Sequence, residues 1–353
     1  MKYNRLQNFY KDKKVLVTGH TGFVGAWLCV TLDFLGADVI GFSLKEEENS
    51  LYKKIKSNLR LENYYGDLRD IDEIRECIEK SQPDIVFHLA AYGFIHECNN
   101  NPHMAFSSNI MGTVNLLEVI RNNQSIKDIV IASSDKVYRN DDMAPQLFNE
   151  RDSLGGIDPY SCSKTCEDLI VQSYFTTYLK NQRKSVTILR PSNIVGGGDH
   201  NISRLIPSII SNIENNERIE IRNPEAIRPW QYILDAVDAY VVTANKSWNT
   251  SSIQIYNIGP TPENIRSVGE IVDILFMSAK GMKSIYSSAS NSEFLLEKKY
   301  LGLDIEKIKE TIGWKPRKKL EETMCDTYNF YKEWNHNNSY ELCRKYISAY
   351  YNT

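Results

Sequence analysis

The chain has 353 residues, of which 42% are hydrophobic and 25% charged, as is usual for a globular protein. Its 42 basic and 45 acidic side chains give a net charge of −3, which argues against nucleic acid or an anionic membrane surface as a partner. No segment resembles a signal peptide or is apolar for long enough to cross a bilayer. We therefore expect a cytoplasmic protein that consists of one large domain or of two fused domains.

Cysteine usage also favours a reducing compartment. The seven cysteines are Cys29, Cys77, Cys98, Cys162, Cys166, Cys325 and Cys343. Their odd number and the absence of Cys-x-x-Cys spacing indicate free thiols. Cys162 and Cys166 are one helical turn apart, but no histidine or further cysteine lies near them in sequence, so we predict no metal site.

The first part of the chain alternates short apolar segments with helical ones. Strands are predicted at 15–18, 38–42, 63–68, 83–88, 129–132 and 186–189, and helices at 69–80, 105–121 and 160–178. The continuous apolar character of the strands is typical of strands buried on both faces. This alternation predicts an α/β fold with a parallel, doubly wound sheet of the Rossmann type.

After Arg190 the alternation weakens. We expect a glycine-rich loop over 191–199, a helix over 206–213, a short strand at 219–221 and an irregular segment over 222–230. A helix over 232–245 and a strand at 253–258 follow, and the tail is mostly helical. No clean linker separates the two parts, so we expect them to pack together.

Three glycines, Gly19, Gly22 and Gly25, stand between the first strand and the first helix. Glycine there permits a tight turn and lets the backbone approach a pyrophosphate, which the helix N-terminus stabilises. The alternative is a plain strand–helix turn. Because the flanking strand and helix match the context of a dinucleotide fingerprint, we predict dinucleotide binding by a variant of it.

The second strand ends in Gly41-Phe42-Ser43 and lacks the acidic residue that commonly binds ribose. Ser43 is the candidate for a hydrogen bond to a ribose hydroxyl. Since no arginine stands there to bind a 2′-phosphate, NAD is favoured over NADP. Asp67, after the third strand, is a candidate for the adenine amine, although a turn-capping aspartate explains it equally well.

Polar residues follow the strand at 129–132 and open the helix after it. Ser133-Ser134-Asp135-Lys136 comes directly after the strand, and Tyr160-x-x-x-Lys164 begins the helix. The spacing of Tyr160 and Lys164 places both on one helix face, where an ammonium lowers the pKa of a phenol. Taken alone, such a pair is most often a surface helix pair.

As a set, these motifs, with His88-Leu89-Ala90-Ala91 and Asn109, resemble the extended short-chain dehydrogenase/reductase superfamily. The resemblance implies a Rossmann domain for NAD over residues 1–190, rejoined by about 231–258. It implies a smaller C-terminal α/β domain for a nucleotide sugar over 191–230 and 259–353. It also implies a homodimer formed through the helices at 105–121 and 160–178.

The resemblance, together with the candidates above, assigns a set of residues to NAD. They are Gly19, Thr21, Gly22, Phe23, Val24, Gly25, Ser43, Asp67, Leu68, Leu89, Ala90, Ala91, Asn109, Tyr160 and Lys164. Val24 stands where the superfamily usually has lysine.

The residues after Ser134 narrow the choice among the reaction types of this superfamily. Sugar 4-epimerases usually have small or apolar residues there, whereas Asp135-Lys136 resembles the 4,6-dehydratases. Most of those carry Asp-Glu, and Asp-Lys is similar to the CDP-glucose 4,6-dehydratases. The segments 155–160, 193–199 and 221–231 agree with that subfamily. The alternatives are an epimerase or C4 oxidoreductase on the same fold, or a non-catalytic NAD-binding subunit.

The resemblance also implies catalytic roles. Tyr160 removes the proton of the C4 hydroxyl, Lys164 lowers the tyrosine pKa and binds the nicotinamide ribose, and Ser134 hydrogen-bonds the C4 oxygen. Asp135 and Lys136 eliminate water across C5 and C6, and either could be the acid. The alternative for this pair is a local ion pair.

Six residues are candidates for binding the substrate: His96, Ser134, Asn193, Arg204, Arg222 and Arg228. Arg222 and Arg228 suit diphosphate oxygens, and domain packing is the alternative role for each. The loop at 92–97 differs from that of the dehydratases, so the sequence leaves the hexose open.

Overall fold

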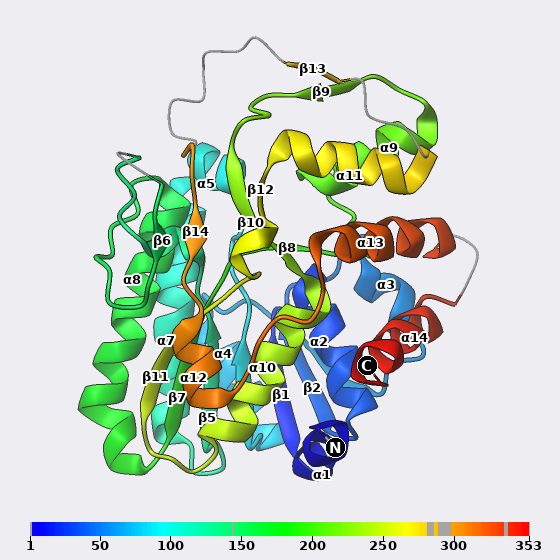
Figure 1. Cartoon of the computed structure of the whole chain (residues 1–353). Helices are drawn as coiled ribbons and strands as arrows, with labels where there is room; N and C mark the ends of the chain where they lie inside the picture. Colours follow the sequence, from blue (N-terminus) through cyan, green and yellow to red (C-terminus); the bar gives the residue numbers. More distant parts are fainter. Residues whose placement is uncertain (1, 143–144, 281–285, 289–297, 335–337, 353) are drawn as a thin grey trace.

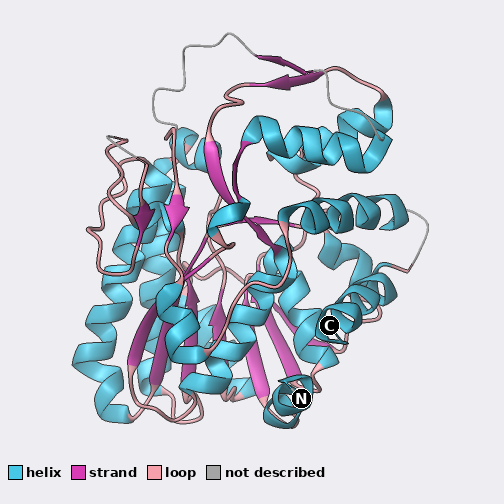
Figure 2. Ribbon diagram, in the orientation of Figure 1, coloured by secondary structure: helices cyan, strands magenta, loops and turns pink. Residues whose placement is uncertain are grey.

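The computed structural model describes residues 2–142, 145–280, 286–288, 298–334 and 338–352. A seven-stranded parallel sheet, ordered β11-β7-β5-β4-β1-β2-β3, lies between two layers of helices (Figures 1 and 2). Its strands are β1 (Lys14–Thr18), β2 (Asp38–Ser43), β3 (Leu61–Tyr65), β4 (Ile85–His88), β5 (Asp128–Ala132), β7 (Ser185–Pro191) and β11 (Ile253–Ile258). The predicted Rossmann fold is confirmed.

The two helix layers explain why the strands are apolar throughout. Val15 and Val17 of β1 point into one core and Leu16 points into the other, so the strand is buried on both faces after the exposed Lys14 at its start. One layer holds α1 (Lys2–Tyr10), α2 (Phe23–Phe34), α3 (Leu51–Ile55), α10 (Ile233–Ser247), α12 (Glu306–Ile312) and α14 (Ser339–Asn352). The other layer holds α4 (Ile71–Ser81), α7 (Gly112–Asn122) and α8 (Pro159–Tyr174).

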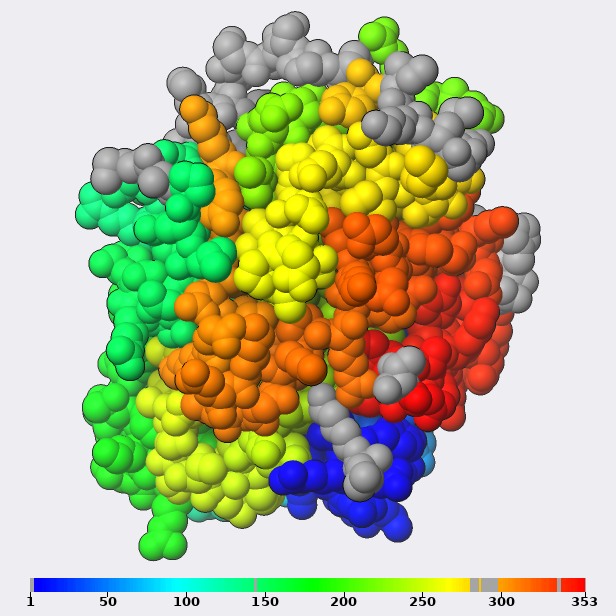
Figure 3. All heavy atoms as spheres, in the orientation of Figure 1, coloured from blue at the N-terminus to red at the C-terminus, as the bar shows by residue number. Residues whose placement is uncertain are grey.

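The two ends of the chain lie side by side. The first and last segments meet in one corner of the molecule (Figure 3), and the rings of Tyr3 and Tyr351 are 5.8 Å apart. This contact places α1 and α14 against the same side of the sheet.

A second group of elements lies beyond the carboxyl ends of the central strands (Figure 1). It contains a three-stranded sheet of β8 (Asn193–Val195), β10 (Ile227–Tyr232) and β12 (Ile265–Ser267). Its helices are α9 (Leu205–Asn215), α11 (Val268–Lys280) and α13 (Leu320–Trp334), which share a separate apolar core. Two small parallel pairs join β9 (Ile219–Ile221) to β13 (Tyr286–Ser288) and β6 (Leu147–Phe148) to β14 (Gly302–Leu303). The exact domain limits stay a prediction.

Several predicted local structures are wrong. The segment 222–230, predicted to be irregular, enters strand β10, and the loop predicted at 191–199 contains strand β8. Pro229 made the first segment look unsuited to a strand. Its missing N–H is tolerated because pairing of β10 with β8 begins only at Trp230.

The helix predicted over 105–121 is also interrupted. It consists of α6 (Pro102–Phe106), a π-helical turn η1 (Ser107–Met111) and α7. A π-helical turn shifts the helix face by adding one residue, and here it contains the buried Asn109. In the described part of the chain no helix has the length and apolar character needed to span a membrane.

Asp128, at the start of β5, is a buried carboxyl group. Its Oδ2 atom accepts a hydrogen bond from Ser247 Oγ at 2.6 Å, while Oδ1 has no partner among the described residues. Burial raises the pKa of Asp128 to about 7. An aspartate in the unfolded chain titrates near 4, so ionisation in the folded protein becomes a penalty as pH rises between about 4 and 7.

We therefore expect Asp128→Asn to reduce the loss of thermal stability between about pH 5 and about pH 8, because the variant has no proton to lose there. Thermal unfolding of both proteins at the two pH values measures this. An equal loss of stability in wild type and variant would contradict the assignment.

Candidate active site

The loop between β1 and α2 forms a cradle that only glycine allows. Gly19 has φ +74°, and a Cβ atom on it would lie 2.7 Å from Ala90 N. A Cβ atom on Gly25 would lie 2.2 Å from Gly19 O. Gly22 is the N-cap of α2 and supplies no side-chain cap, so the first amides of this helix are left for a ligand. This geometry fits the pyrophosphate of a dinucleotide.

The predicted ribose and adenine residues surround this cradle. Thr21 Oγ1 lies 2.8 Å from Ser43 Oγ, which joins the loop to the end of β2. Asp67 accepts the backbone N–H of Arg69 at 2.9 Å and pairs with its guanidinium, which lowers the pKa of Asp67. The turn-capping role that the sequence left open is therefore present, and a role in binding adenine stays a prediction.

A buried chain of hydrogen bonds fixes the other side of the cradle. Ala90 N–H donates to Thr18 Oγ1 at 3.3 Å, and Thr18 Oγ1 lies 2.8 Å from His88 Nδ1. His88 Nε2 lies 2.9 Å from Thr113 Oγ1, which donates to Asn109 O at 2.7 Å. Burial lowers the pKa of His88 to about 3. The directions of donation therefore require a neutral ring with its proton on Nε2.

Sequence reasoning missed Thr18 and Thr113, although a threonine at the end of an otherwise apolar strand was a usable signal. The side-chain amide of Asn109 makes hydrogen bonds within the chain, and its predicted contact with NAD stays a prediction. Its Oδ1 accepts from Tyr92 N at 2.7 Å, and its Nδ2 donates to Ser163 Oγ at 2.8 Å. It thereby connects the loop after β4 with α8.

Ser134, Asp135 and Lys136 form a compact polar group after β5, in the short helix η2 (Asp135–Val137). Asp135 is only 1% exposed, and its Oδ1 accepts from Ser134 Oγ at 3.2 Å and from Lys136 Nζ at 3.0 Å. Its Oδ2 is buried with no partner among the described residues. The ion-pair alternative is thus present, but it leaves one carboxylate oxygen for another group.

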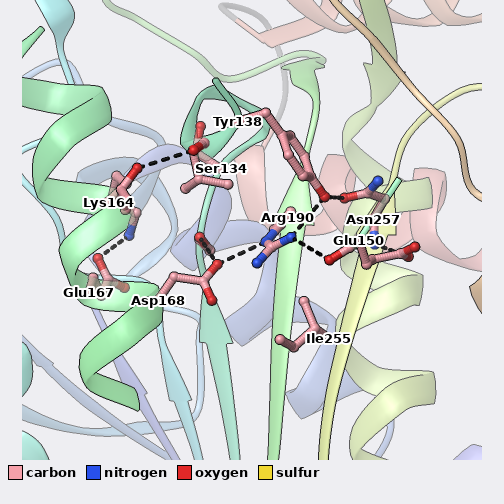
Figure 4. Close-up of polar contacts among 12 residues, drawn as sticks. Ser134, Tyr138, Glu150, Lys164, Glu167, Asp168, Arg190, Ile255 and Asn257 are labelled. Carbon is pink, nitrogen blue, oxygen red and sulfur yellow. Dashed lines mark hydrogen bonds and ion pairs between the residues drawn. The ribbon is translucent and has the colours of Figure 1, made fainter. Parts of the chain in front are cut away.

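Tyr160 and Lys164 lie on the first turns of α8, whose N-terminus is capped by Asp158. Lys164 Nζ donates to Ala132 O at 2.7 Å and forms an ion pair with Glu167 (Figure 4). Burial raises the pKa of Tyr160, the Ser134 side chain opposes this shift through a hydrogen bond, and the charges of Asp135 and Glu167 add to it. The net shift is upward because burial is its largest cause, and the lowering of the tyrosine pKa by Lys164 stays a prediction.

A second buried ion pair holds α8 against the sheet. Arg190 of β7 donates through Nε to Asp168 Oδ2 at 2.8 Å and through Nη1 to Tyr138 OH at 2.9 Å (Figure 4). Tyr138 in turn donates to Asn257 Oδ1 at 2.6 Å. These residues were not predicted, because their partners are far apart in sequence.

The predicted substrate residues occupy different environments. Asn193, on β8, has a buried Oδ1 without a partner among the described residues. Arg228, on β10, is mostly buried and donates to Ile227 O at 2.8 Å, which supports packing as one of its roles. Arg222 is exposed after β9, and His96 is exposed on α5 (Ile95–Asn100).

Arg204 connects the two parts of the molecule. It donates to Asp199 Oδ2 at 2.8 Å, and its guanidinium carbon lies 4.6 Å from the ring centre of Phe94. Phe94 belongs to the loop after β4, so this cation–π contact brings the loop at 92–97 to the segment before α9. The described residues contain no cluster of three or more metal-ligating side chains.

The sequence model described as the NAD dependent epimerase/dehydratase family matches residues 15–259. The chain belongs to this family. It is 35% identical to CDP-glucose 4,6-dehydratase of Salmonella typhimurium over 97% of this chain and 98% of that protein. It is 27% identical to dTDP-glucose 4,6-dehydratase of Haemophilus influenzae, over 90% and 97% of the two chains. The resemblance stated from the motifs is confirmed.

Solved structures of family members share the fold. UDP-glucose 4-epimerase of Thermotoga maritima matches with a TM-score of 0.80 at 21% identity, covering 92% of this chain and 100% of that one. dTDP-glucose 4,6-dehydratase of Bacillus anthracis, solved in complex with NAD, matches with a TM-score of 0.75 at 22% identity, covering 91% and 97%. The Rossmann arrangement of this family member is therefore the one its relatives use.

We expect Gly25→Ala to weaken binding of added NAD by about tenfold or more, since the new Cβ atom would displace Gly19 and close the cradle. Calorimetric titration of cofactor-free protein measures this. Gly36→Ala is the control, because Gly36 lies after the other end of α2 and a Cβ atom there meets no atom within 4 Å, so any strain from its φ of +87° stays away from the cradle. Equal NAD affinity in wild type and Gly25→Ala would show that the cradle is not part of the cofactor site.

Proposed function

We propose that this chain is an NAD-dependent nucleotide-sugar 4,6-dehydratase that converts CDP-glucose to CDP-4-keto-6-deoxyglucose. The observation that carries the proposal is the Asp135–Lys136 pair beside Ser134 and Tyr160, in which one carboxylate oxygen of Asp135 is buried and has no partner in the described part of the chain. The 35% identity to a CDP-glucose 4,6-dehydratase over nearly both full lengths supports the same reaction.

The first half of the reaction oxidises C4 of the sugar. NAD, when bound, would supply hydride chemistry: an acceptor for the hydride of C4 and, in reduced form, the donor of the hydride that C6 receives. Tyr160 takes the proton of the C4 hydroxyl, and Ser134 hydrogen-bonds the same oxygen, because the two side chains interact with each other at the end of β5. Lys164 is held beside them at Ala132 O.

The second half removes water across C5 and C6. The 4-keto group makes the C5 proton acidic, so a base must remove it while an acid protonates the C6 hydroxyl. Asp135 and Lys136 are 3.0 Å apart, and a proton moved from Lys136 to Asp135 creates an acid and a neutral amine base together. Asp135 then protonates the leaving hydroxyl, and Lys136 takes the C5 proton.

An epimerase is the second candidate, because UDP-glucose 4-epimerase of Mycoplasma genitalium is 25% identical over 93% of this chain. Epimerisation at C4 uses the serine and tyrosine but needs no acid and base at C5 and C6. The buried oxygen of Asp135, which no described residue contacts by a hydrogen bond, therefore favours the dehydratase.

Purified protein incubated with CDP-glucose should form a product lighter by one water, detected by mass spectrometry. Lys136→Ala and Asp135→Asn should each lower kcat by about 10²–10⁴, the usual contribution of general acid–base catalysis, while NAD binding persists. Lys80→Ala, which removes an exposed lysine on α4, is the control. A product of unchanged mass would indicate epimerisation, and full activity of Lys136→Ala would contradict its role.

We further propose that the active protein is a cytoplasmic homodimer. The seven free cysteines suit a reducing compartment. Large apolar side chains are exposed on the two helical segments predicted to pair: Phe106, Met111, Leu169 and Tyr178. Exposed apolar side chains gathered on neighbouring helices are typical of a protein interface.

Leu169→Glu is expected to convert a dimer to a monomer, because it buries a charge in the proposed interface. Light scattering on the eluting protein gives the molar mass. Met277→Glu is a matched control, since Met277 on α11 has the same 52% exposure as Leu169 but lies outside those helices. A monomeric wild type, or a dimeric Leu169→Glu protein, would contradict the interface.

A further inference from the structure

Glu167 is a buried acidic group that the proposed reaction does not use. Its Oε2 atom forms the ion pair with Lys164, and the two side chains are only 1% and 3% exposed. Its Oε1 atom has no hydrogen-bond partner among the described residues. Burying a carboxylate that is only half satisfied is unfavourable, and an apolar side chain of similar volume would often serve stability as well. The group therefore needs a functional explanation.

The position of Glu167 on α8 suggests that function. Tyr160, Lys164 and Glu167 are spaced by four and three residues, so they share one face of the helix. Lys164 is thus held between the phenol that moves a proton and the carboxylate that balances its charge. Its ammonium is kept at Ala132 O, 2.7 Å away, at the end of β5.

Few of the titratable groups packed around this face of α8 change their charge near neutral pH. His88 on β4, Cys98 on α5 and Tyr240 on α10 all approach it. Burial lowers the pKa of His88 to about 3, raises that of Cys98 to about 11 and raises that of Tyr240, so these three stay uncharged.

The remaining charged neighbours are paired. Asp168 is neutralised by Arg190, and Asp135 is paired with Lys136. Burial raises the pKa of Glu167 to about 7, the Lys164 ammonium opposes the shift, and Asp168 adds to it. Glu167 is therefore the group on this face that gains or loses a proton near neutral pH.

We propose that Glu167 is a positioning residue that holds the Lys164 ammonium at β5 and whose negative charge sets how readily Tyr160 releases its proton. Only the kinetic test of this proposal rests on the proposed function. When Glu167 is ionised, its charge raises the pKa of Tyr160 and offsets the ammonium. When it is protonated, the ammonium of Lys164 is no longer offset by the charge of Glu167.

The test compares Glu167→Gln, which keeps an oxygen for Lys164 but removes the charge, with Glu167→Asp, which keeps the charge on a shorter side chain. In Glu167→Gln the rising limb of the pH profile of kcat/KM should move to lower pH by about one unit, a tenfold change in proton affinity. In Glu167→Asp, kcat should fall while the rising limb of the kcat/KM profile keeps the pH position that it has in wild type. Glu76→Gln, which removes a carboxylate from an exposed pair, is the control and should match wild type.

A second measurement needs no substrate. The phenolate absorbance of Tyr160 is the difference between each protein and the same protein carrying Tyr160→Phe. The midpoint of the pH titration of this absorbance should lie at lower pH in Glu167→Gln than in wild type and Glu167→Asp. Coincident midpoints in Glu167→Gln and Glu167→Asp would overturn the proposal. Should no nucleotide sugar react, the proposed function fails while this titration still decides the role of Glu167.

Discussion

The buried ion pair between Arg190 and Asp168 is the contact on which the site depends. Arg190 is 1% exposed and Asp168 is fully buried, and the pair joins the end of β7 to the middle of α8. Removing one partner of such a pair typically costs about 3–5 kcal/mol, because the other charge is left buried. The pair fixes the rotation of α8, and with it the side chains of Tyr160, Lys164 and Glu167 relative to β5.

Two kinds of buried polar group lie around the site. Below it, two networks are matched: Arg190 uses Tyr138 and Asp168, and the His88 chain is complete from Ala90 to Asn109. At the carboxyl edge of the sheet, buried oxygens of Asp135, Asn193 and Glu167 have no partner among the described residues. A matched network gives rigidity, whereas an unmatched buried oxygen costs free energy that a ligand or a proton can offset. The unmatched oxygens of Asp135 and Asn193 accordingly lie at residues predicted to touch substrate.

The errors of sequence reasoning have physical causes. The spacing of Tyr160 and Lys164 on one helix face could not show that burial raises the pKa of the phenol, because burial depends on elements that are distant in sequence. Glu167 also lies within one turn of Lys164 and balances it inside the core. Strand β10 was missed for a similar reason, since the cost of Pro229 depends on where the neighbouring strand begins to pair.

The sequence by itself determined what depends on short stretches of chain. The glycine spacing at 19–25, the apolar strands and the Asp135-Lys136 sequence specify a dinucleotide cradle, a Rossmann fold and a local ion pair, because each acts through neighbours within a few residues. Tertiary structure alone decided the contacts between distant segments, such as Arg190 with Asp168 and Arg204 with Phe94. It also decided which carboxylates are buried and which are balanced, since burial and charge balance are sums over all surrounding elements.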